Sequence, residues 1–271
     1  MLLALDTSNH HASVALVKDG QLAAELTWEV GRRHSQELLE RVRWLCASCA
    51  ARPADLTSVA AALGPGSFNG ARVAVTTAKA LAFALNLPIY GCSTLDAIAC
   101  GHMDAHGTLV ALLDAGRGEV YAGIYFVGRD VLAPSVPSAH GIALPLVPGL
   151  WRLGEPLITM PDALARTIAG PFLVCGEWQD ATRAALEHAA GARVHFAQRF
   201  GGRRASWLAA LALHRVAHGE PDSAMTLEPL YLRRPAITSS AKHTALGLNF
   251  ALAASDQSAL HEQGDSHALR H

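Results

Sequence analysis

The side chains best placed for chemistry in this sequence are two aspartates that each end a short apolar segment. Asp6 follows residues 2–5 and Asp114 follows residues 109–113. Between them, a Gly-Pro-Gly-Ser loop stands after a third apolar segment and before a helix-like stretch. Glycines in such a loop let the backbone approach a ligand, and the N–H groups at a helix N-terminus attract an anion. In the actin, Hsp70 and sugar-kinase fold, two such aspartate turns face each other across a cleft that holds phosphate, so the candidate binding residues are Asp6, Gly64, Gly66 and Asp114.

The same residues also have a structural interpretation, which the sequence leaves open. Aspartate side chains stabilise turns, and a glycine loop can serve a tight strand-to-helix turn without any ligand. Spacing excludes two nucleotide-binding motifs, because the loop lacks the lysine of a P-loop and Gly70 comes one residue too late for a dinucleotide fingerprint. Neither a P-loop ATPase nor a dehydrogenase is indicated.

Two further residue pairs have the spacing of redox or metal motifs. Cys46 and Cys49 fall near the C-terminal end of a predicted helix, where the helix dipole disfavours a thiolate. His102 and His106 would face one another on a helix, but glycines bracket them and two histidines leave a metal shell incomplete. Both pairs are interpreted as structural or surface residues, and no metal site is expected.

Strand and helix patterns repeat along the chain and predict the elements that position Asp6, the glycine loop and Asp114. Residues 2–30 contain a strand followed by a hairpin, and residues 56–63 form the strand before the glycine loop. Helical periodicity marks residues 35–49 and residues 68–85. A second strand and hairpin follow over residues 109–127, so the chain is predicted to form two lobes.

The C-terminal half has a weaker pattern. Residues 132–161 are rich in proline and glycine and are expected to be irregular, whereas residues 206–216 are helical in pattern. We therefore expect an N-terminal lobe at residues 1–105, a C-terminal lobe at residues 106–235 and a poorly ordered tail at residues 236–271.

Composition is typical of a globular protein of the cytoplasm. Of 271 residues, 51% are apolar and 17% are charged, which suits a large core. The N-terminus does not read as a signal peptide, and no apolar run reaches the ~18 residues of a membrane span. Five cysteines, an odd number, fit a reducing compartment. A net charge of -1 gives little affinity for nucleic acid, so unaided binding should be weak.

Five segments of the sequence are informative together: LALDTSNHHASVAL near the N-terminus, RRHSQELL at 32–39, GPGSFNGARV at 64–73, DAGRGEVYAGIY from Asp114 and PLYLRR at 229–234. In combination they resemble the TsaB family, also called YeaZ. The resemblance covers most of residues 1–235, and its GPGSF-x-G-x-R block is highly specific. It implies an α/β fold of the actin, Hsp70 and sugar-kinase (ASKHA) class, with two lobes and a duplicated sheet-and-helix core.

The resemblance also implies a helper's role in tRNA modification. TsaB-like proteins are non-catalytic paralogues of TsaD, and they bind it in the complex that forms N6-threonylcarbamoyladenosine at position 37 of tRNAs reading codons that begin with A. The implied partners are a TsaD-like catalytic subunit, a TsaE-like ATPase reached through the complex, and tRNA as part of that complex. TsaD-like proteins carry metal-binding histidines where this chain has Thr94 and Ile98, so the catalytic metal should be missing.

Several positions depart from the usual TsaB pattern. Asn69, Ala71, Ala74 and Gly116 replace the residues common in the family at the loop, the following helix and the second aspartate turn. These departures imply a relaxed cleft. No cofactor is therefore expected, and ATP or ADP should bind weakly at most.

The resemblance implies that the partner-binding surface lies on the two predicted helices at residues 35–49 and 68–85. In TsaB-like proteins these helices form a four-helix bundle with TsaD or with a second copy of the chain. On the second helix, an apolar stripe from Ala71 to Leu85 can pack on the sheet and leaves another face outward. A homodimer through this face is the alternative to a TsaD-like partner. The expected interface residues are His34, Ser35, Leu38, Arg72, Thr76, Lys79 and Phe83.

Two rival functions remain open. The paired turns at Asp6 and Asp114 favour a phosphotransferase that uses ATP and acts alone, although no other kinase feature is present. A metallopeptidase would need a metal site that the sequence does not supply. Metal content and ATP turnover of the purified chain separate these functions from a scaffold.

Overall fold

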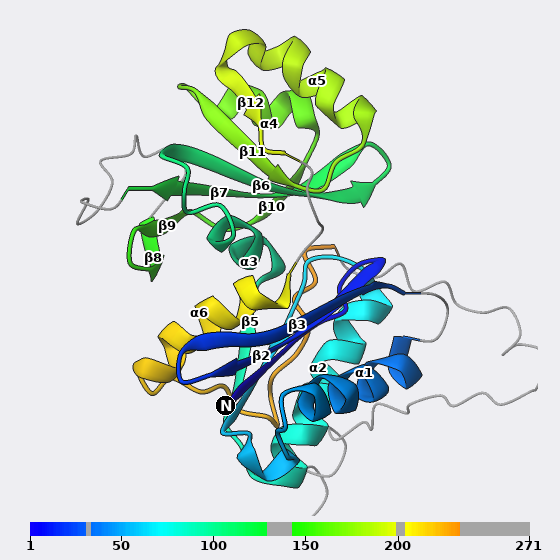
Figure 1. The fold of residues 1–271 in the computed structure, drawn as a ribbon. Helices are drawn as coiled ribbons and strands as arrows, with labels where there is room; N and C mark the ends of the chain where they lie inside the picture. Colours follow the sequence, from blue (N-terminus) through cyan, green and yellow to red (C-terminus); the bar gives the residue numbers. More distant parts are fainter. Residues whose placement is uncertain (31–33, 129–142, 199–203, 234–271) are drawn as a thin grey trace, which may run out of the picture. The chain divides into compact units, whose positions relative to one another are not determined.

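The computed structural model describes residues 1–30, 34–128, 143–198 and 204–233, and Met1–Arg234 form one compact unit. The expected tail at residues 236–271 lies outside the described residues. Two β-sheets form the unit, each with helices packed on it (Figure 1). None of the helices in these described ranges combines the length and the apolar character that crossing a bilayer requires.

The first sheet has five strands in the order β3-β2-β1-β4-β5. β1 is central because it pairs antiparallel with β2 and parallel with β4. Every residue of β1 and of β4 is buried, as expected for strands covered on both faces. Asp19 and Gly20 join β2 to β3 with positive φ angles of 50° and 76°, which suit a tight hairpin turn. The strands are β1 (Leu2–Asp6), β2 (His11–Lys18), β3 (Gln21–Glu29), β4 (Ser58–Ala62) and β5 (Ile89–Cys92).

Helices cover both faces of the first sheet. Leu3 and Leu5 of β1 belong to the core that α1 and α2 close on one face. Leu2 and Ala4 belong to a second core, closed by α6 on the other face. This alternation follows from the strand geometry, since successive side chains point to opposite faces. The helices are α1 (His34–Ser48), α2 (Phe68–Leu85), α3 (Thr94–Cys100), α4 (Pro161–Thr167), α5 (Asp180–Ala190) and α6 (Ala205–Ala217), with short 3-10 helices η1 (Pro53–Asp55) and η3 (Gly191–Arg193).

The α2 helix begins and ends where the sequence predicts. Its N-cap is Ser67, whose hydroxyl accepts a hydrogen bond from the Gly70 N–H, and Asn86 ends it in the left-handed conformation. The predicted apolar stripe is confirmed. Its members Ala71, Val75, Ala78 and Ala82 are buried, and Leu85 is half-buried.

The second sheet repeats the pairing of the first. β6 pairs antiparallel with the next strand, β7, and parallel with β11, which pairs parallel with β12. β1, β2, β4 and β5 have the same relations in the first sheet. The expected α/β fold with a duplicated sheet-and-helix core is confirmed. The strands are β6 (Gly107–Gly116), β7 (Glu119–Val127), β8 (Ala143–Val147), β9 (Leu150–Leu153), β10 (Leu157–Thr159), β11 (Phe172–Gly176) and β12 (Val194–Phe196).

The expectation of irregular structure over residues 132–161 is wrong for the part that the structure describes. β8, β9 and β10 lie there, and the first two form a hairpin with its turn at Pro148 and Gly149. The signal is weak because these strands are short and Pro145 stands beside an irregularity in their register. The proline and glycine at 148 and 149, which contribute to the expectation of irregular structure, form the turn of this hairpin.

The chain returns to the first sheet after it completes the second. α6 packs on the first sheet through Ala205, Leu208 and Ala212. The extended segment that follows, residues 219–233, is called the strap below. Our expected boundaries put all of residues 106–235 in the C-terminal lobe, whereas α6 and the strap contact the N-terminal one.

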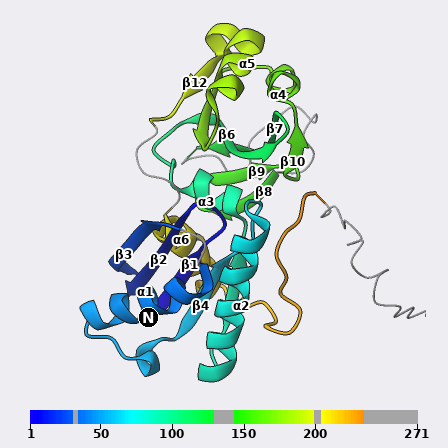
Figure 2. The ribbon, with the colours of Figure 1, turned by 90° about the vertical axis from the view of Figure 1, so that its right-hand side faces the viewer.

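The strap runs beside α2, on the side away from α1 (Figure 2). Leu227 of the strap lies in the core of the first sheet, and the Leu230 N–H donates to the Leu63 carbonyl at 2.7 Å. An ion pair fixes the start of the strap. The Arg215 guanidinium contacts both carboxylate oxygens of Asp222 at 2.9 and 3.1 Å, and the same carboxylate accepts from the Gly91 N–H at 2.6 Å.

Replacing Asp222 with alanine should therefore lower the free energy of unfolding by about 2 kcal/mol, because Arg215 loses its carboxylate partner and the Gly91 N–H loses its acceptor. Urea denaturation followed by circular dichroism measures this loss. Asp162→Ala removes an exposed pair with Arg166 on α4 and should change stability by less than about 0.5 kcal/mol. Equal effects of the two variants would mean that the strap is not anchored through Asp222.

Candidate functional site

The turn after β1 is closed by its own hydrogen bonds. Asp6 is 2% exposed, and its carboxylate accepts from both the N–H and the hydroxyl of Ser8. The Thr7 hydroxyl donates to the Gly70 carbonyl at 2.6 Å. Asp6 therefore acts through its Oδ1 atom as the acceptor that shapes a turn.

The glycine loop packs directly on this turn. The Ser67 N–H donates to the Ser8 carbonyl at 2.7 Å. A Cβ atom added to Gly66 or Gly70 would lie less than 3.0 Å from the carbonyl oxygen of Ser8 or of Thr7. Both glycines thus allow two backbone segments to touch, which accounts for these residues without a ligand.

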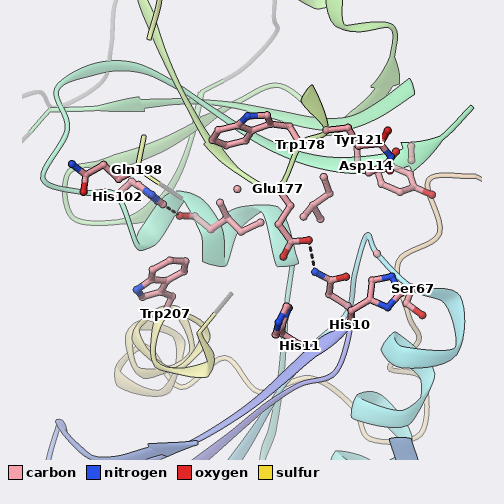
Figure 3. Close-up of a pocket in the computed structure, with 17 residues that line it drawn as sticks. His10, His11, Ser67, His102, Asp114, Tyr121, Glu177, Trp178, Gln198 and Trp207 are labelled. Atoms are coloured by element: carbon pink, nitrogen blue, oxygen red, sulfur yellow. Dashed lines mark hydrogen bonds between the residues drawn. The ribbon is translucent and has the colours of Figure 1, made fainter. Parts of the chain in front are cut away.

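A cavity of about 770 Å³ opens beside these turns and is lined from both sheets (Figure 3). Of the four residues that the sequence suggests for a ligand cleft, Gly66 and Asp114 line it, while Asp6 and Gly64 do not. Aromatic and polar side chains dominate its walls. The lining residues are Asn9, His10, His11, Gly66, Ser67, Ile98, His102, Leu113, Asp114, Ala115, Tyr121, Gly176, Glu177, Trp178, Gln179, Gln198 and Trp207.

Two carboxylates reach the cavity from the second sheet. Asp114, at the turn of the β6–β7 hairpin, accepts from the Gly116 N–H at 2.8 Å and from the Gln179 side-chain amide. Glu177 follows β11 and accepts from the Asn9 side-chain amide (Figure 3). The hydrogen bond between Asn9 and Glu177 joins the β1–β2 turn to the second sheet across the cavity.

The histidine pair does not form a shared site. His102 lines the cavity, where its ring lies edge-on to Trp207 with centroids 5.5 Å apart and its Nδ1 lies 2.9 Å from the Ile98 carbonyl oxygen. His106 is exposed and does not line the cavity. Within the described residues, no three or more His, Cys, Asp or Glu side chains are grouped as metal ligands.

The cysteines occupy structural positions. Cys46 is buried and Cys49 half-buried near the end of α1, as their spacing on that helix predicts. Burial raises the pKa of Cys46, and it raises the pKa of Cys92 to about 12 and that of Cys100 to about 11. These thiols therefore stay protonated at neutral pH and are poor nucleophiles or ligands.

The helix α3 connects the cavity to a buried ion pair. Its Asp96 carboxylate accepts from the Tyr125 hydroxyl at 2.8 Å and lies 3.1 Å from the Arg152 guanidinium. Burial raises the pKa of Asp96, while the charge of Arg152 opposes that rise. The pair holds α3 to β7 and β9 of the second sheet.

The outer side of α2 carries most of the expected interface residues. Arg72, Thr76 and Phe83 are exposed there, and Lys79 is half-buried. Leu38 was also expected at the interface, but it is fully buried in the core between α1 and the first sheet. The side chains of His34 and Ser35 lie outside the described ones.

Comparison with known proteins identifies the group to which this arrangement belongs. The family model of TsaD, tRNA N6-adenosine threonylcarbamoyltransferase, matches residues 28–237. This chain belongs to that family.

Relatives within the family are TsaB proteins, which confirms the resemblance seen in the sequence. The chain is 36% identical over 139 residues to the tRNA threonylcarbamoyladenosine biosynthesis protein TsaB of Bacillus subtilis, and 36% identical over 122 residues to that of Escherichia coli. These matches cover 51% and 44% of this chain and 61% and 52% of the relatives, so the chain spans little more than half of their length. The structure of YeaZ from Pseudomonas aeruginosa superimposes with a TM-score of 0.67 at 26% identity, covering 85% of this chain and 99% of that one.

Several residues that line the cavity could not be identified from the sequence. Glu177 and Trp178 follow the end of β11, and Trp207 comes from α6. An acid after an apolar strand is the same signal that marks Asp6 and Asp114, so Glu177 could be found by extending that search to each strand end. Trp207 has no such signal, because its place depends on the return of the chain to the first sheet.

Proposed function

We propose that this chain is a non-catalytic subunit that binds and supports a TsaD-like catalytic subunit in forming N6-threonylcarbamoyladenosine at position 37 of tRNAs reading codons that begin with A. The observation that carries the proposal is the chemistry of α3. Thr94 and Ile98, fully buried there, stand where the family resemblance puts the metal-binding histidines of TsaD-like proteins. Thr94 contacts the Ser8 hydroxyl at 3.2 Å, and Ile98 packs in a core. Neither replaces an imidazole as a metal ligand.

Packing of the glycine loop also argues against the rival phosphotransferase. In that function Asp6 and Asp114 would face a common ligand, whereas Asp6 is closed in its own turn and only Asp114 lines the cavity. At Gly66 and Gly70 the loop backbone packs directly on the backbone of Ser8 and Thr7. These contacts support a cofactor-free scaffold that binds ATP or ADP weakly at most.

The proposed partners follow from the outer side of α2. A TsaD-like subunit packs there and on α1, while a TsaE-like ATPase and tRNA join through the assembled complex. A second copy of the chain could use the same side in the absence of TsaD. With a net charge of -1, the chain contributes little tRNA affinity by itself, and we place its work in the cytoplasm.

Reconstitution tests this function. The chain, its TsaD-like subunit, the other proteins of the pathway from the same organism and unmodified tRNA are combined, and the modified nucleoside is measured by mass spectrometry. We expect omission of this chain to lower product at least about tenfold and the chain alone to form none. Full activity without the chain, or product from the chain alone, would overturn the proposal.

Charge placed on the outer side of α2 should break the complex. Phe83→Glu and Thr76→Glu should each weaken binding to the TsaD-like subunit by about 3 kcal/mol, because each places a bulky charged side chain in a packed helix contact. Titration calorimetry measures binding, and circular dichroism checks the fold. Leu144→Glu, an exposed apolar position on β8, is the matched control and should bind normally. Wild-type affinity in both folded α2 variants would place the interface elsewhere.

A further inference from the structure

The end of the strap contacts the second sheet. The Arg233 guanidinium donates to the Ala115 carbonyl oxygen at 3.1 Å and forms an ion pair with the Glu119 carboxylate. Ala115 stands near the end of β6 and Glu119 begins β7, so one side chain spans the turn between the two strands. The side chains of the ion pair are 31% and 34% exposed, which leaves the pair only partly open to water.

The turn that Arg233 holds forms part of the cavity wall. Ala115 and its neighbour Asp114 both line the cavity, and Figure 3 shows Asp114 on the side of the second sheet. The turn itself is loosely packed, since a Cβ atom added to Gly116 would meet no atom within 4 Å. The Gln179 amide, which also bonds Asp114, comes from the same lobe. The Arg233 contacts therefore tie this turn to a segment that belongs to the first sheet.

The strap is fixed to the first sheet shortly before Arg233. The Leu230 N–H donates to the carbonyl of Leu63, just after β4. The Leu230 carbonyl oxygen lies 3.1 Å from the place that a Cβ atom at Gly64 would take, so the strap backbone packs on the glycine loop. Three residue steps separate Leu230 from Arg233 and span at most roughly 11 Å. The chain between these two anchors has little slack.

Tyr231 is a third anchor, between the other two. Its hydroxyl accepts from the Arg72 Nε at 2.9 Å, and its ring lies 4.9 Å from the Phe68 ring. The Arg72 guanidinium is 3.8 Å from the centre of the Phe68 ring. These three side chains stack at the start of α2, where they attach the strap to the helix that follows the glycine loop.

We propose that the end of the strap is a clasp that fixes the β6–β7 turn to the start of α2. The clasp residues are Leu230, Tyr231 and Arg233. By holding the turn, the clasp sets the place of Asp114 in the wall of the cavity. The inference goes beyond the proposed function, because the clasp acts within one chain and requires no partner.

The clasp also accounts for a segment that the proposed function leaves unexplained. PLYLRR contains all three clasp residues, and it contacts both the GPGSFNGARV segment and the segment that begins at Asp114. Three of the five segments that carry the family resemblance therefore meet at the clasp. Their shared place in the structure is the junction between the two sheets.

Hydrogen exchange of the full chain, measured by mass spectrometry, tests the clasp, since local opening of the turn lets its amides exchange. Arg233→Gln and Glu119→Gln should each raise the exchange rate over residues 112–122 about fivefold, because either change breaks the ion pair. The double variant should exchange like Arg233→Gln, since both changes remove one interaction. Arg183→Gln breaks an exposed pair with Glu187 in the same lobe and should stay within about twofold of wild type.

A variant away from the turn separates a clasp from a local ion pair. Tyr231→Ala removes the stacked ring and leaves Arg233 and Glu119 in place, yet it should raise exchange over residues 112–122 at least about threefold, because the strap loses an anchor. Met225→Ser changes an exposed side chain of the same strap and should have no effect.

The outcomes decide the inference without reference to the partner. Exchange over residues 112–122 at the wild-type rate in both Arg233→Gln and Glu119→Gln would show that the ion pair does not hold the turn. A wild-type rate in Tyr231→Ala alone would reduce the contact to a local ion pair, and the clasp would be wrong. Binding of a TsaD-like subunit does not enter this measurement, so failure of the proposed function leaves the test unaffected.

Discussion

Replacing Arg152 with methionine should lower the free energy of unfolding by about 3 kcal/mol at pH 7.5, because it leaves the buried Asp96 carboxylate without its cation. The Tyr125 hydroxyl still donates to Asp96, so part of the carboxylate's solvation is kept. Arg166→Met breaks an exposed pair with Asp162 and should cost less than about 0.5 kcal/mol. Chemical denaturation of both variants provides the comparison.

The pH dependence identifies Asp96 as the source of the loss. Burial raises the native pKa of Asp96 above its value in the unfolded chain, which is about 3.9. The folded state then holds the proton more tightly, so the contribution of this group is greatest below the unfolded pKa and is lost as pH rises through the native pKa. Without Arg152 the native pKa rises further. The deficit of Arg152→Met should therefore shrink as pH falls from about 7.5 toward the unfolded pKa, and a constant deficit would contradict the assignment.

The ion pair between Asp96 and Arg152 is an example of a contact that local sequence patterns do not predict. Hydrophobic periodicity predicts α2 to the residue, and strand signals predict the β1–β2–β3 and β6–β7 segments, because these patterns depend on neighbours in the sequence. Asp96 and Arg152 are 56 residues apart and meet only when α3 packs under the second sheet. No local pattern carries that information.

Some residues of the candidate site can likewise be suggested from the sequence, and others cannot. Asp114 and Gly66, which the sequence suggests for ligand binding because each stands at the end of an apolar strand or in the loop that follows one, both line the cavity. The sequence cannot distinguish Asp114 from Asp6, which ends a strand equally but is sealed by Ser8 and by the packed glycine loop. The path of the strap beside α2 is not predicted, although its end belongs to the PLYLRR segment at 229–234. The strap residues have no periodicity, because they are held by separate contacts to Arg215, Lys79 and Leu63.

Replacing Gly70 with alanine should destabilise the protein by at least about 3 kcal/mol or prevent it from folding. Helix propensity alone favours alanine over glycine inside α2 by about 1 kcal/mol, so an isolated helix would gain from the change. In the folded chain, the new methyl group would lie less than 3.0 Å from the Thr7 carbonyl oxygen. Thr7 is fully buried and its hydroxyl is bonded to the Gly70 carbonyl, so this backbone cannot move away cheaply. The clash should therefore outweigh the gain in propensity.

Thermal unfolding of Gly70→Ala, with Gly170→Ala as control, measures that balance. A Cβ at Gly170 meets no atom within 4 Å, and that variant should unfold within a few degrees of wild type. Gly66→Ala should behave like Gly70→Ala, because its Cβ would collide with the Ser8 carbonyl. If both loop variants fold with wild-type stability, the two turns can separate. The loop would then have room for a ligand, and the packing argument against a phosphate site beside Asp6 would fall.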